Sequence, residues 1–188
     1  MVGPWLSGEK VYLRPPRDSD LQRRVEWLND PETFRLFTGS LPSRPYEYAD
    51  AQRWLQNLET DATAFLWSIE TADHRHIGDV DLHDIDFKIG VARLTILIGD
   101  KEFWGKGYGR DAVRTVLRYA FLELGLESVS LRVYDFNNRA IRCYEKCGFE
   151  KVGTSDKYSP LMEPGQIYMT ATRERFFAEN PDVSFVRT

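Results

Sequence analysis

Apolar residues recur every three or four positions in four stretches of the chain, which is the spacing of a helix that buries one face. The expected helices span residues 18–28, 46–58, 107–124 and 139–146. The third is the clearest, because its apolar stripe is unbroken until Gly125, and glycine commonly ends a helix. That stripe consists of Val113, Val116, Leu117, Ala120, Phe121 and Leu124.

Elsewhere the apolar period shortens to two, or apolar residues form short runs, and both patterns predict strands. The expected strands span residues 11–14, 65–69, 76–82, 91–98, 128–134, 149–153 and 166–172. In the fourth of these, every second residue from Ala92 to Ile98 is apolar, with Arg93 and Thr95 on the other face.

The resulting order, β-α-α-β-β-β-α-β-α-β-β, predicts an α/β protein with one long central sheet. The 188 residues contain no repeat, low-complexity run or linker, so we expect a single domain over residues 1–188 with a core over about 8–172. We expect residues 173–188 to form a C-terminal extension that supplies apolar surface to a possible homodimer. The side chains that suggest this are Phe176, Phe177 and Phe185.

The composition is that of a globular and mildly acidic protein. Hydrophobic residues make up 42% of the chain, charged residues 29%, and 25 Lys and Arg against 29 Asp and Glu give a net charge of −4. Nucleic-acid binders normally carry a basic excess, so no nucleic-acid partner is expected. No apolar run approaches 18 residues, and the N-terminus lacks the basic start and apolar core of a signal peptide. We therefore expect a cytoplasmic protein with no membrane partner.

The two cysteines predict neither a disulfide nor a metal site. Cys143 and Cys147 are four residues apart in an expected helix, a spacing that does not suit a conventional disulfide. A metal site needs more ligands nearby, and the three histidines are far away in sequence. We expect two buried or half-buried thiols and no metal.

Three alternating glycines, Gly105, Gly107 and Gly109, lie where the longest helix begins. Glycine lets successive backbone N–H groups turn toward one anion, and the start of a helix adds unsatisfied donors. Residues 101–118 contain five basic and two acidic side chains, a local charge of +3 that leaves −7 for the rest of the chain. This pattern favours a small polyanionic ligand.

Neither of two familiar phosphate motifs fits this turn. Five residues separate Gly99 from Gly105, and Lys106 is followed by Gly107, so it is not a Walker A loop. The spacing Gly-x-Gly-x-Gly also differs from the dinucleotide pattern Gly-x-Gly-x-x-Gly. A simple connecting turn is therefore the alternative interpretation.

A second segment, about thirty residues later, favours a binding site over a simple connecting turn. Residues 137–149 have the pattern Asn-x-x-Ala-x-x-x-Tyr-x-x-x-Gly-Phe after an expected strand. Together with the turn Trp104-Gly105-Lys106-Gly107-Tyr108-Gly109, this resembles the GNAT N-acetyltransferase superfamily, most specifically from Leu94 to Gly153. The family usually has Gln or Arg where this chain has Trp104.

The resemblance implies a GNAT fold: a mostly antiparallel mixed sheet of about seven strands, splayed in the middle and flanked by about four helices. It also implies acetyl-coenzyme A as the donor, held between strands 91–98 and 128–134, without a metal. The residues expected to bind it are Leu97, Ile98, Gly99, Trp104, Gly105, Lys106, Gly107, Tyr108, Gly109, Arg110, Asn137 and Tyr144.

By the same resemblance Tyr144 would protonate the departing thiolate. An ordinary tyrosine pKa near 10 is close to that of a thiol, so this transfer needs little driving force. The alternative is an aromatic side chain that packs on the sheet with its hydroxyl in water.

The general base is less clear, because Arg93 stands where many family members have Glu. Asp79, Asp81 and His83 share one face of the preceding strand and are the best substitutes. A carboxylate cluster would hold a cationic amine, whereas the alternative is a solvated strand face.

The resemblance therefore implies an N-acetyltransferase acting on a small-molecule amine or a peptide N-terminus. The segment Trp27-Leu28-Asn29-Asp30-Pro31 and Trp104 resemble the branch that contains ribosomal-protein N-terminal acetyltransferases and related small-molecule enzymes, which does not choose the substrate. Aromatic residues of the first two helices and their loop would line the acceptor slot or form core; we expect core for Trp27 and Trp54. The competing hypothesis is a non-catalytic domain of the same fold that binds acetyl-coenzyme A as a sensor.

Overall fold

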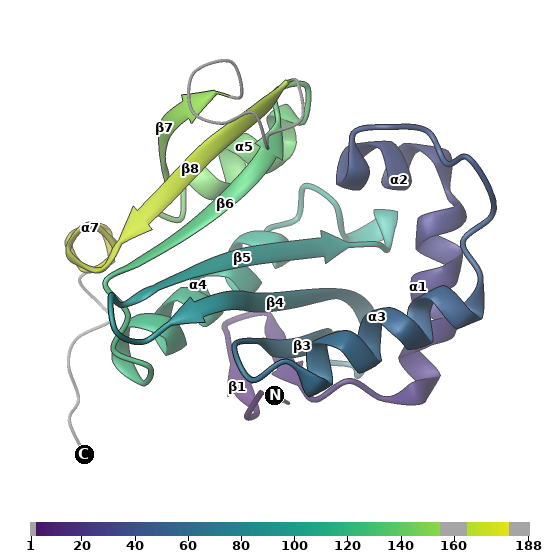
Figure 1. Ribbon diagram of the computed structural model, residues 1–188, viewed down its shortest axis with the longest axis horizontal. Helices are drawn as coiled ribbons and strands as arrows, with labels where there is room; N and C mark the ends of the chain where they lie inside the picture. Colours follow the sequence, from purple (N-terminus) through teal and green to yellow (C-terminus); the bar gives the residue numbers. More distant parts are fainter. Residues whose placement is uncertain (1–2, 155–164, 181–188) are drawn as a thin grey trace.

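One open sheet of eight strands, in the order β1-β2-β3-β4-β5-β6-β8-β7, organises the computed structural model, which describes residues 3–154 and 165–180 (Figure 1). The strands are β1 Leu6–Ser7, β2 Val11–Arg14, β3 Phe65–Thr71, β4 His76–Asp86, β5 Val91–Ile98, β6 Ser128–Tyr134, β7 Glu150–Thr154 and β8 Gln166–Thr172. The helices are α1 Asp18–Asn29, α2 Pro31–Thr38, α3 Tyr48–Thr60, α4 Tyr108–Leu122, α5 Asn138–Glu145 and α7 Arg173–Glu179.

The predicted α/β class and mostly antiparallel sheet are confirmed, because β5 and β6 form the one parallel pair in the described sheet. The described residues hold eight strands and six helices rather than about seven and four. The additions are β1, α2 and α7. β1 has only two residues, too few for a periodic signal.

The sequence pattern does not predict α2, because Asn29-Asp30-Pro31 is also a pattern that ends a helix. Asp30 is both the C-cap of α1 and the N-cap of α2, and its carboxylate accepts a hydrogen bond from the Thr33 amide at 2.9 Å. Proline is well suited to the first position of a helix, where its missing N–H would have no partner. The same Asn-Asp-Pro sequence thus ends one helix and starts the next.

The parallel pair β5–β6 is short and then opens. Val91, Ala92 and Arg93 pair with residues 128–130, and no pairing continues toward the ends of the two strands. The strands diverge beyond this point into a V, with β1 to β5 in one wing and β6, β8 and β7 in the other (Figure 1). The splay expected from the resemblance is therefore present between the expected strands.

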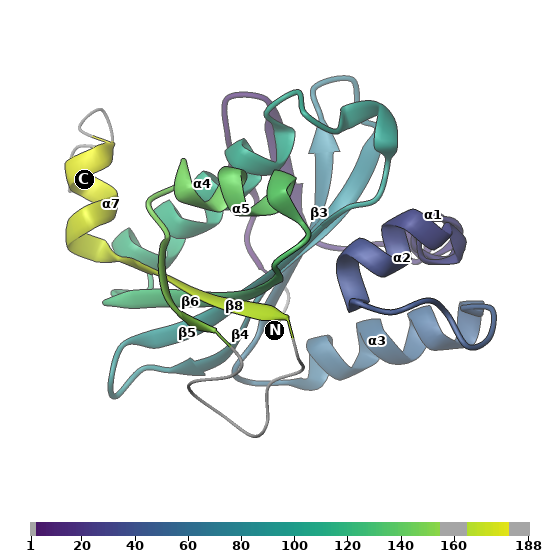
Figure 2. The same ribbon diagram turned by 90° about the horizontal axis from the view of Figure 1, so that it is seen from above.

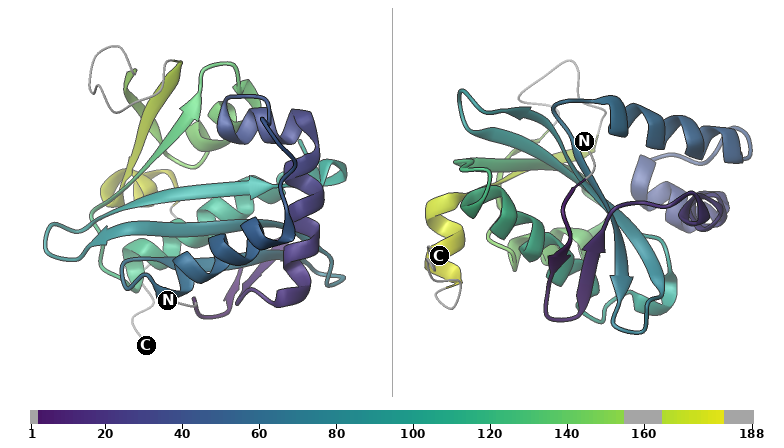
Figure 3. Two further views of the ribbon diagram at one scale, coloured as in Figure 1. Left: turned by 45° about the vertical axis from the view of Figure 1, so that its right-hand side comes forward. Right: turned by 90° about the horizontal axis from the view of Figure 1, so that it is seen from below.

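Helices cover both faces of the sheet. α4 and α5 lie on one face and α3 on the other (Figure 2), while α1, α2 and α3 gather at one end of the molecule and α7 lies at the other (Figure 3). The α4 stripe packs on the apolar strand face, and Val113, Val116, Leu117 and Phe121 are fully buried. Within the two described ranges, no helix has the length and apolar character to cross a membrane.

α2 bridges the two wings at the open end of the V. On the β5 side, Lys101 forms ion pairs with Asp30 at 2.6 Å and Glu32 at 2.8 Å. On the β6 side, the Tyr134 hydroxyl donates to the Thr38 carbonyl at 2.6 Å and the Asn137 amide donates to the Leu36 carbonyl at 3.2 Å. This helix therefore limits how far the wings separate.

A buried carboxylate ties the β1–β2 turn to α4. Asp111 accepts hydrogen bonds from the backbone amides of Glu9, Lys10 and Val11 at 3.1, 2.7 and 3.0 Å. These contacts hold Lys10 beside the glycine turn that precedes α4.

The expectation that Phe176 supplies exposed surface for a dimer is wrong. Phe176 on α7 is fully buried, and its ring lies 5.4 Å from that of Phe121 on α4. Part of the expected extension thus completes the core, because α7 covers the end of α4. Phe185 lies outside the described residues.

We predict that Phe176→Ala lowers the free energy of unfolding by about 3–5 kcal/mol, because it leaves a cavity beside Phe121. Urea denaturation at equilibrium measures the change. The control is Phe87→Ala, whose side chain is 57% exposed and should cost no more than about 0.5 kcal/mol. Equal, small effects of both substitutions would show that α7 is not part of the core.

Candidate functional site

A cleft of about 1000 Å³ lies where β5 and β6 diverge. Its walls come from the cleft-facing parts of β5, β6, β8 and α5, from the glycine turn and the start of α4, and from α2. Residues of both wings therefore meet in one site that depends on the splay of the sheet.

The lining of the cleft is strongly cationic. Among the described residues that line it, eight are Lys or Arg and none is Asp or Glu. The eight are Lys10, Arg93, Lys106, Arg110, Arg132, Arg139, Arg142 and Lys146. In a protein with a net charge of −4, this concentration of one sign favours a polyanionic ligand.

The glycine turn has the conformation that the sequence suggested. Gly105 and Gly107 have φ values of +72° and +90°, which side chains of L-residues rarely adopt. Gly107 is the N-cap of α4, so the first amides of the helix have no partner within it. A Cβ at Gly105 would meet no atom within 4 Å, which leaves open space for a ligand against the turn.

Ten of the twelve residues expected to bind the donor line the cleft, and the exceptions are Gly99 and Tyr108. Gly99 instead allows the Trp27 ring to pack closely on the backbone, because a Cβ at this position would lie 2.0 Å from that ring. The Tyr108 ring packs edge-on against Phe103, with centroids 5.0 Å apart. Trp27 is 6% exposed, as expected for core.

Trp104 connects the glycine turn to both wings. Its indole N–H donates to the Ile98 carbonyl at 2.6 Å, and the Arg139 guanidinium lies 3.5 Å from the centroid of its ring. Trp104 therefore brings a cation from α5 to the glycine turn, where the family usually supplies a polar side chain. Arg139 is not among the residues predicted from sequence, although it lies inside the Asn-x-x-Ala segment.

Asn137 uses its side chain to position two helices. Its Oδ1 accepts from the Ala140 amide at 3.2 Å as the N-cap of α5, and its Nδ2 donates to Leu36 on α2. The residue lines the cleft, but both polar atoms of its side chain already have protein partners.

Tyr144 lies on α5, is 8% exposed and lines the cleft. No described residue hydrogen-bonds its hydroxyl group. Burial, together with the nearby thiols of Cys143 and Cys147, raises its pKa well above the ordinary value. Tyr144 therefore stays protonated at neutral pH, as a proton donor must.

His83 and Asp81 form a hydrogen-bonded pair at the other side of the site. His83 Nδ1 lies 2.7 Å from Asp81 Oδ1, and only His83 of the two lines the cleft. Burial raises the pKa of Asp81. Burial lowers the pKa of His83, but the Asp81 carboxylate outweighs it and leaves the His83 pKa above 6.5.

Asp79 is separated from this pair by its own partners. Its carboxylate forms an ion pair with Arg24 at 2.9 Å and lies 3.1 Å from His76 Nε2, and it does not line the cleft. Asp79 and Asp81 are 4% and 7% exposed, so the interpretation of a solvated strand face is wrong for both.

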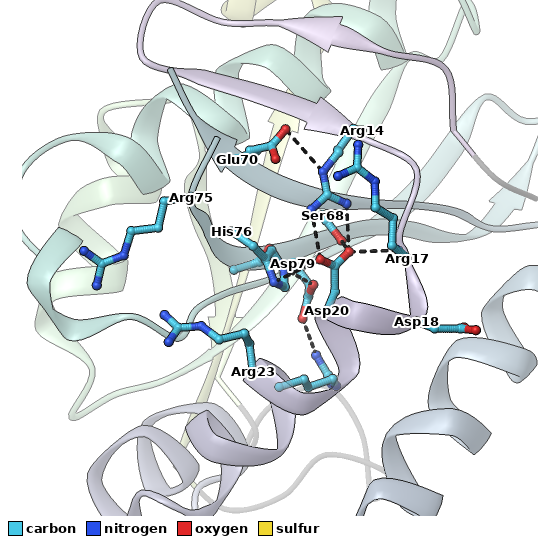
Figure 4. A network of polar contacts seen from close by, with 12 residues as sticks. Arg14, Arg17, Asp18, Asp20, Arg23, Ser68, Glu70, Arg75, His76 and Asp79 are labelled. Carbon is cyan, nitrogen blue, oxygen red and sulfur yellow. Dashed lines mark hydrogen bonds and ion pairs between the residues drawn. The ribbon is translucent and has the colours of Figure 1, made fainter. Parts of the chain in front are cut away.

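Asp79 belongs to a buried polar network that holds α1 against the sheet (Figure 4). At its centre Asp20 accepts two hydrogen bonds from Arg14, at 2.7 and 2.9 Å, and one from the Ser68 hydroxyl. Arg24 lies on the buried side of α1, three residues after Leu21. That position within the apolar stripe was the sequence signal that could have revealed a buried ion pair.

The chain is similar to known acetyltransferases over most of its length. A family described as "Acetyltransferase (GNAT) domain" matches residues 10–150. The uncharacterized prophage-derived N-acetyltransferase YokL of Bacillus subtilis is 34% identical over 176 residues, which cover 91% of this chain and 89% of YokL. Human alpha/beta-tubulin-N-acetyltransferase 9 is 28% identical over 165 residues, covering 83% and 80% of the two chains.

A solved structure has the same fold. The spermidine N-acetyltransferase of Vibrio cholerae in complex with CoA and spermine superposes with a TM-score of 0.74 at 24% identity, covering 89% of this chain and 98% of that one. This likeness confirms the predicted GNAT fold of the splayed sheet.

The buried network predicts acid sensitivity. Burial raises the pKa of Asp20, but hydrogen bonds from Arg14 and the charge of His76 outweigh it and lower the pKa from 3.8 to about 2. A depressed carboxyl pKa stabilises the fold above pH 3.8, and this stabilisation, about 2 kcal/mol, is lost as pH falls toward 2.

We therefore predict that Asp20→Asn lowers the free energy of unfolding at pH 7 and flattens its dependence on pH between 4 and 2. Denaturant titrations across that range measure both effects. Asp18→Asn is the matched control in the same helical turn, because Asp18 is exposed. If the Asp20→Asn protein kept the steep acid dependence of the parent, another group would be responsible.

Proposed function

Because the chain belongs to the GNAT acetyltransferase family and is an N-acetyltransferase that uses acetyl-coenzyme A, we propose that it acetylates a primary amine by direct transfer. The amine is that of a small molecule or of a peptide N-terminus. The observation that carries the proposal is the cationic cleft, which combines a glycine turn, Tyr144 and His83 in one space. Acetyl-coenzyme A supplies an acetyl thioester and a tail with several phosphate groups.

The residues of the cleft fit that donor. Lys106 lies between two glycines of the turn and Arg110 follows the last one. Lys10 and Arg139 reach the turn from the β1–β2 turn and α5. Unpartnered amides at the start of α4 add to this site for phosphate. The edge of β5 that faces the cleft has no strand partner after Arg93. Apart from the Ile98 carbonyl, which accepts from Trp104, this edge can pair with an extended chain, as in strand addition.

Tyr144 and His83 divide the proton transfers between them. His83 takes the proton that the amine loses as the new carbon–nitrogen bond forms. Tyr144 donates its hydroxyl proton to the sulfur as the carbon–sulfur bond breaks. Burial raises the pKa of Tyr144, so its hydroxyl still carries the proton when the thiolate begins to leave.

Asp81 positions His83 through the hydrogen bond to Nδ1, which leaves Nε2 as the basic atom. Asp79 has a structural role in this proposal, because Arg24 and His76 already occupy its carboxylate.

The enzymatic reading is preferred to a sensor domain because the similar proteins are named N-acetyltransferases and the cleft contains both a proton donor and a base. One relative is named for tubulin and another for spermidine, which fits a peptide N-terminus or a small amine respectively. Membership of the ribosomal-protein branch, a homodimer and a cytoplasmic location stay predictions.

The proposal is tested by calorimetric titration with acetyl-coenzyme A and by release of free thiol with a panel of amines. We predict that Tyr144→Phe lowers kcat by about 100-fold or more and leaves the Kd for coenzyme A unchanged, because the ring still packs. Tyr12→Phe is the control, since Tyr12 is 39% exposed on β2. If the parent protein gave no binding heat and released no thiol, the proposed function would be refuted. An unchanged kcat in Tyr144→Phe would remove Tyr144 from the acid role.

A second prediction concerns pH. The pKa of His83 lies above 6.5, and only neutral His83 accepts a proton, so kcat/KM should rise with pH through a midpoint above 6.5. Asp81→Asn removes the carboxylate that raises this pKa, so the midpoint should move to lower pH. Both proteins are measured with the same amine, whose own titration then cancels. Identical midpoints would exclude His83 as the base.

A further inference from the structure

Two cleft arginines lie on the face of the sheet that is opposite α4. His83 pairs with Arg93, and Arg93 pairs with Ser130, so these three residues share one face across β4, β5 and β6. Arg132 follows Ser130 by two residues and points to the same side. Leu94, next to Arg93, faces the core beneath α4. Arg93 and Arg132 are therefore separate from the cations around the glycine turn.

Within the part of the chain that the structure describes, these two cations are only weakly neutralised. Arg93 forms an ion pair with Asp84 at 3.0 Å, but the Asp84 side chain is 58% exposed. Arg132 forms no ion pair with any residue in the described ranges. No carboxylate of those ranges lines the cleft, so the described residues that line this side of the site carry an excess of positive charge.

A buried amide beside them lacks a partner. Register places Gln166 opposite Tyr134 and Tyr168 opposite Arg132, so both β8 side chains lie on the arginine face. Gln166 lines the cleft and is 9% exposed, and its Oε1 has no hydrogen-bond partner. A buried acceptor without a partner is costly and is explained when a ligand supplies the donor.

We propose that the acceptor is a primary amine whose own molecule carries an anionic group, a carboxylate or a phosphate. Arg132 and Arg93 bind the anion, and Gln166 Oε1 accepts a hydrogen bond from the amine. This inference rests on the proposed function and names its substrate class. The planar guanidinium group pairs with two oxygens of a carboxylate or phosphate.

The same charges select against polyamines. A polycation entering this side of the cleft would meet Arg93 and Arg132 without a compensating carboxylate among the described lining residues. Placing like charges together is an effective way to reject a competing ligand.

The test compares kcat/KM for matched amines: phenylalanine against phenylalaninamide, glucosamine 6-phosphate against glucosamine, and spermidine. We expect the anionic member of at least one pair to be favoured by 10-fold or more, with spermidine the poorest. The pair that shows the preference distinguishes a carboxylate from a phosphate. Preference for spermidine or for both neutral members overturns the inference but leaves the proposed function intact.

Substitution then assigns the preference to its residue. Arg132→Gln should reduce the favoured ratio to within about threefold, and Arg132→Glu should raise activity toward spermidine, while the Kd for coenzyme A stays unchanged. The control is Arg53→Gln on α3, whose side chain is 67% exposed outside the cleft. Equal losses for charged and neutral amines would refute the role of Arg132. No turnover of any amine would refute the proposed function, and the substrate class with it.

Discussion

The short parallel pairing of β5 with β6 is the constraint on which the site depends. Only three residue pairs join the two strands, so each strand leaves an unpaired edge where the wings separate. Unpaired backbone edges are costly unless something covers them. Here α4 fills the core beneath the division and α2 bridges its open end, so the cleft is held open by structure on two sides.

Charge is divided between the faces of this cleft. The glycine turn, α4, α5 and Lys10 present cations on the side proposed for phosphates, and Arg93 and Arg132 present them on the acceptor side. The β4 carboxylates Asp79 and Asp81 are buried against Arg24 and His83 and do not line it. The net charge of −4 therefore says little about the field that a ligand meets.

The network under α1 fixes the position of the helices in this arrangement. Buried ion pairs return little net stability because desolvation offsets their attraction, but removal of one partner leaves an uncompensated charge. Arg24 also stacks on Trp54 at 3.5 Å, so a single guanidinium links α1, α3 and β4. α2 follows α1 directly through Asp30, and the network thereby sets where the bridge across the V begins.

Local periodicity by itself determined the strands 91–98, 128–134 and 166–172 with the bounds that the structure has, and it located the helix behind the glycine turn. The glycine turn and Tyr144 were identifiable because their motifs are continuous in sequence. α2 and the partner of Asp79 could not be identified from the sequence. The same is true of the group formed by Arg93, Arg132 and Gln166. These depend on strand register and on contacts between segments far apart along the chain, and only the packed sheet brings such residues onto one face.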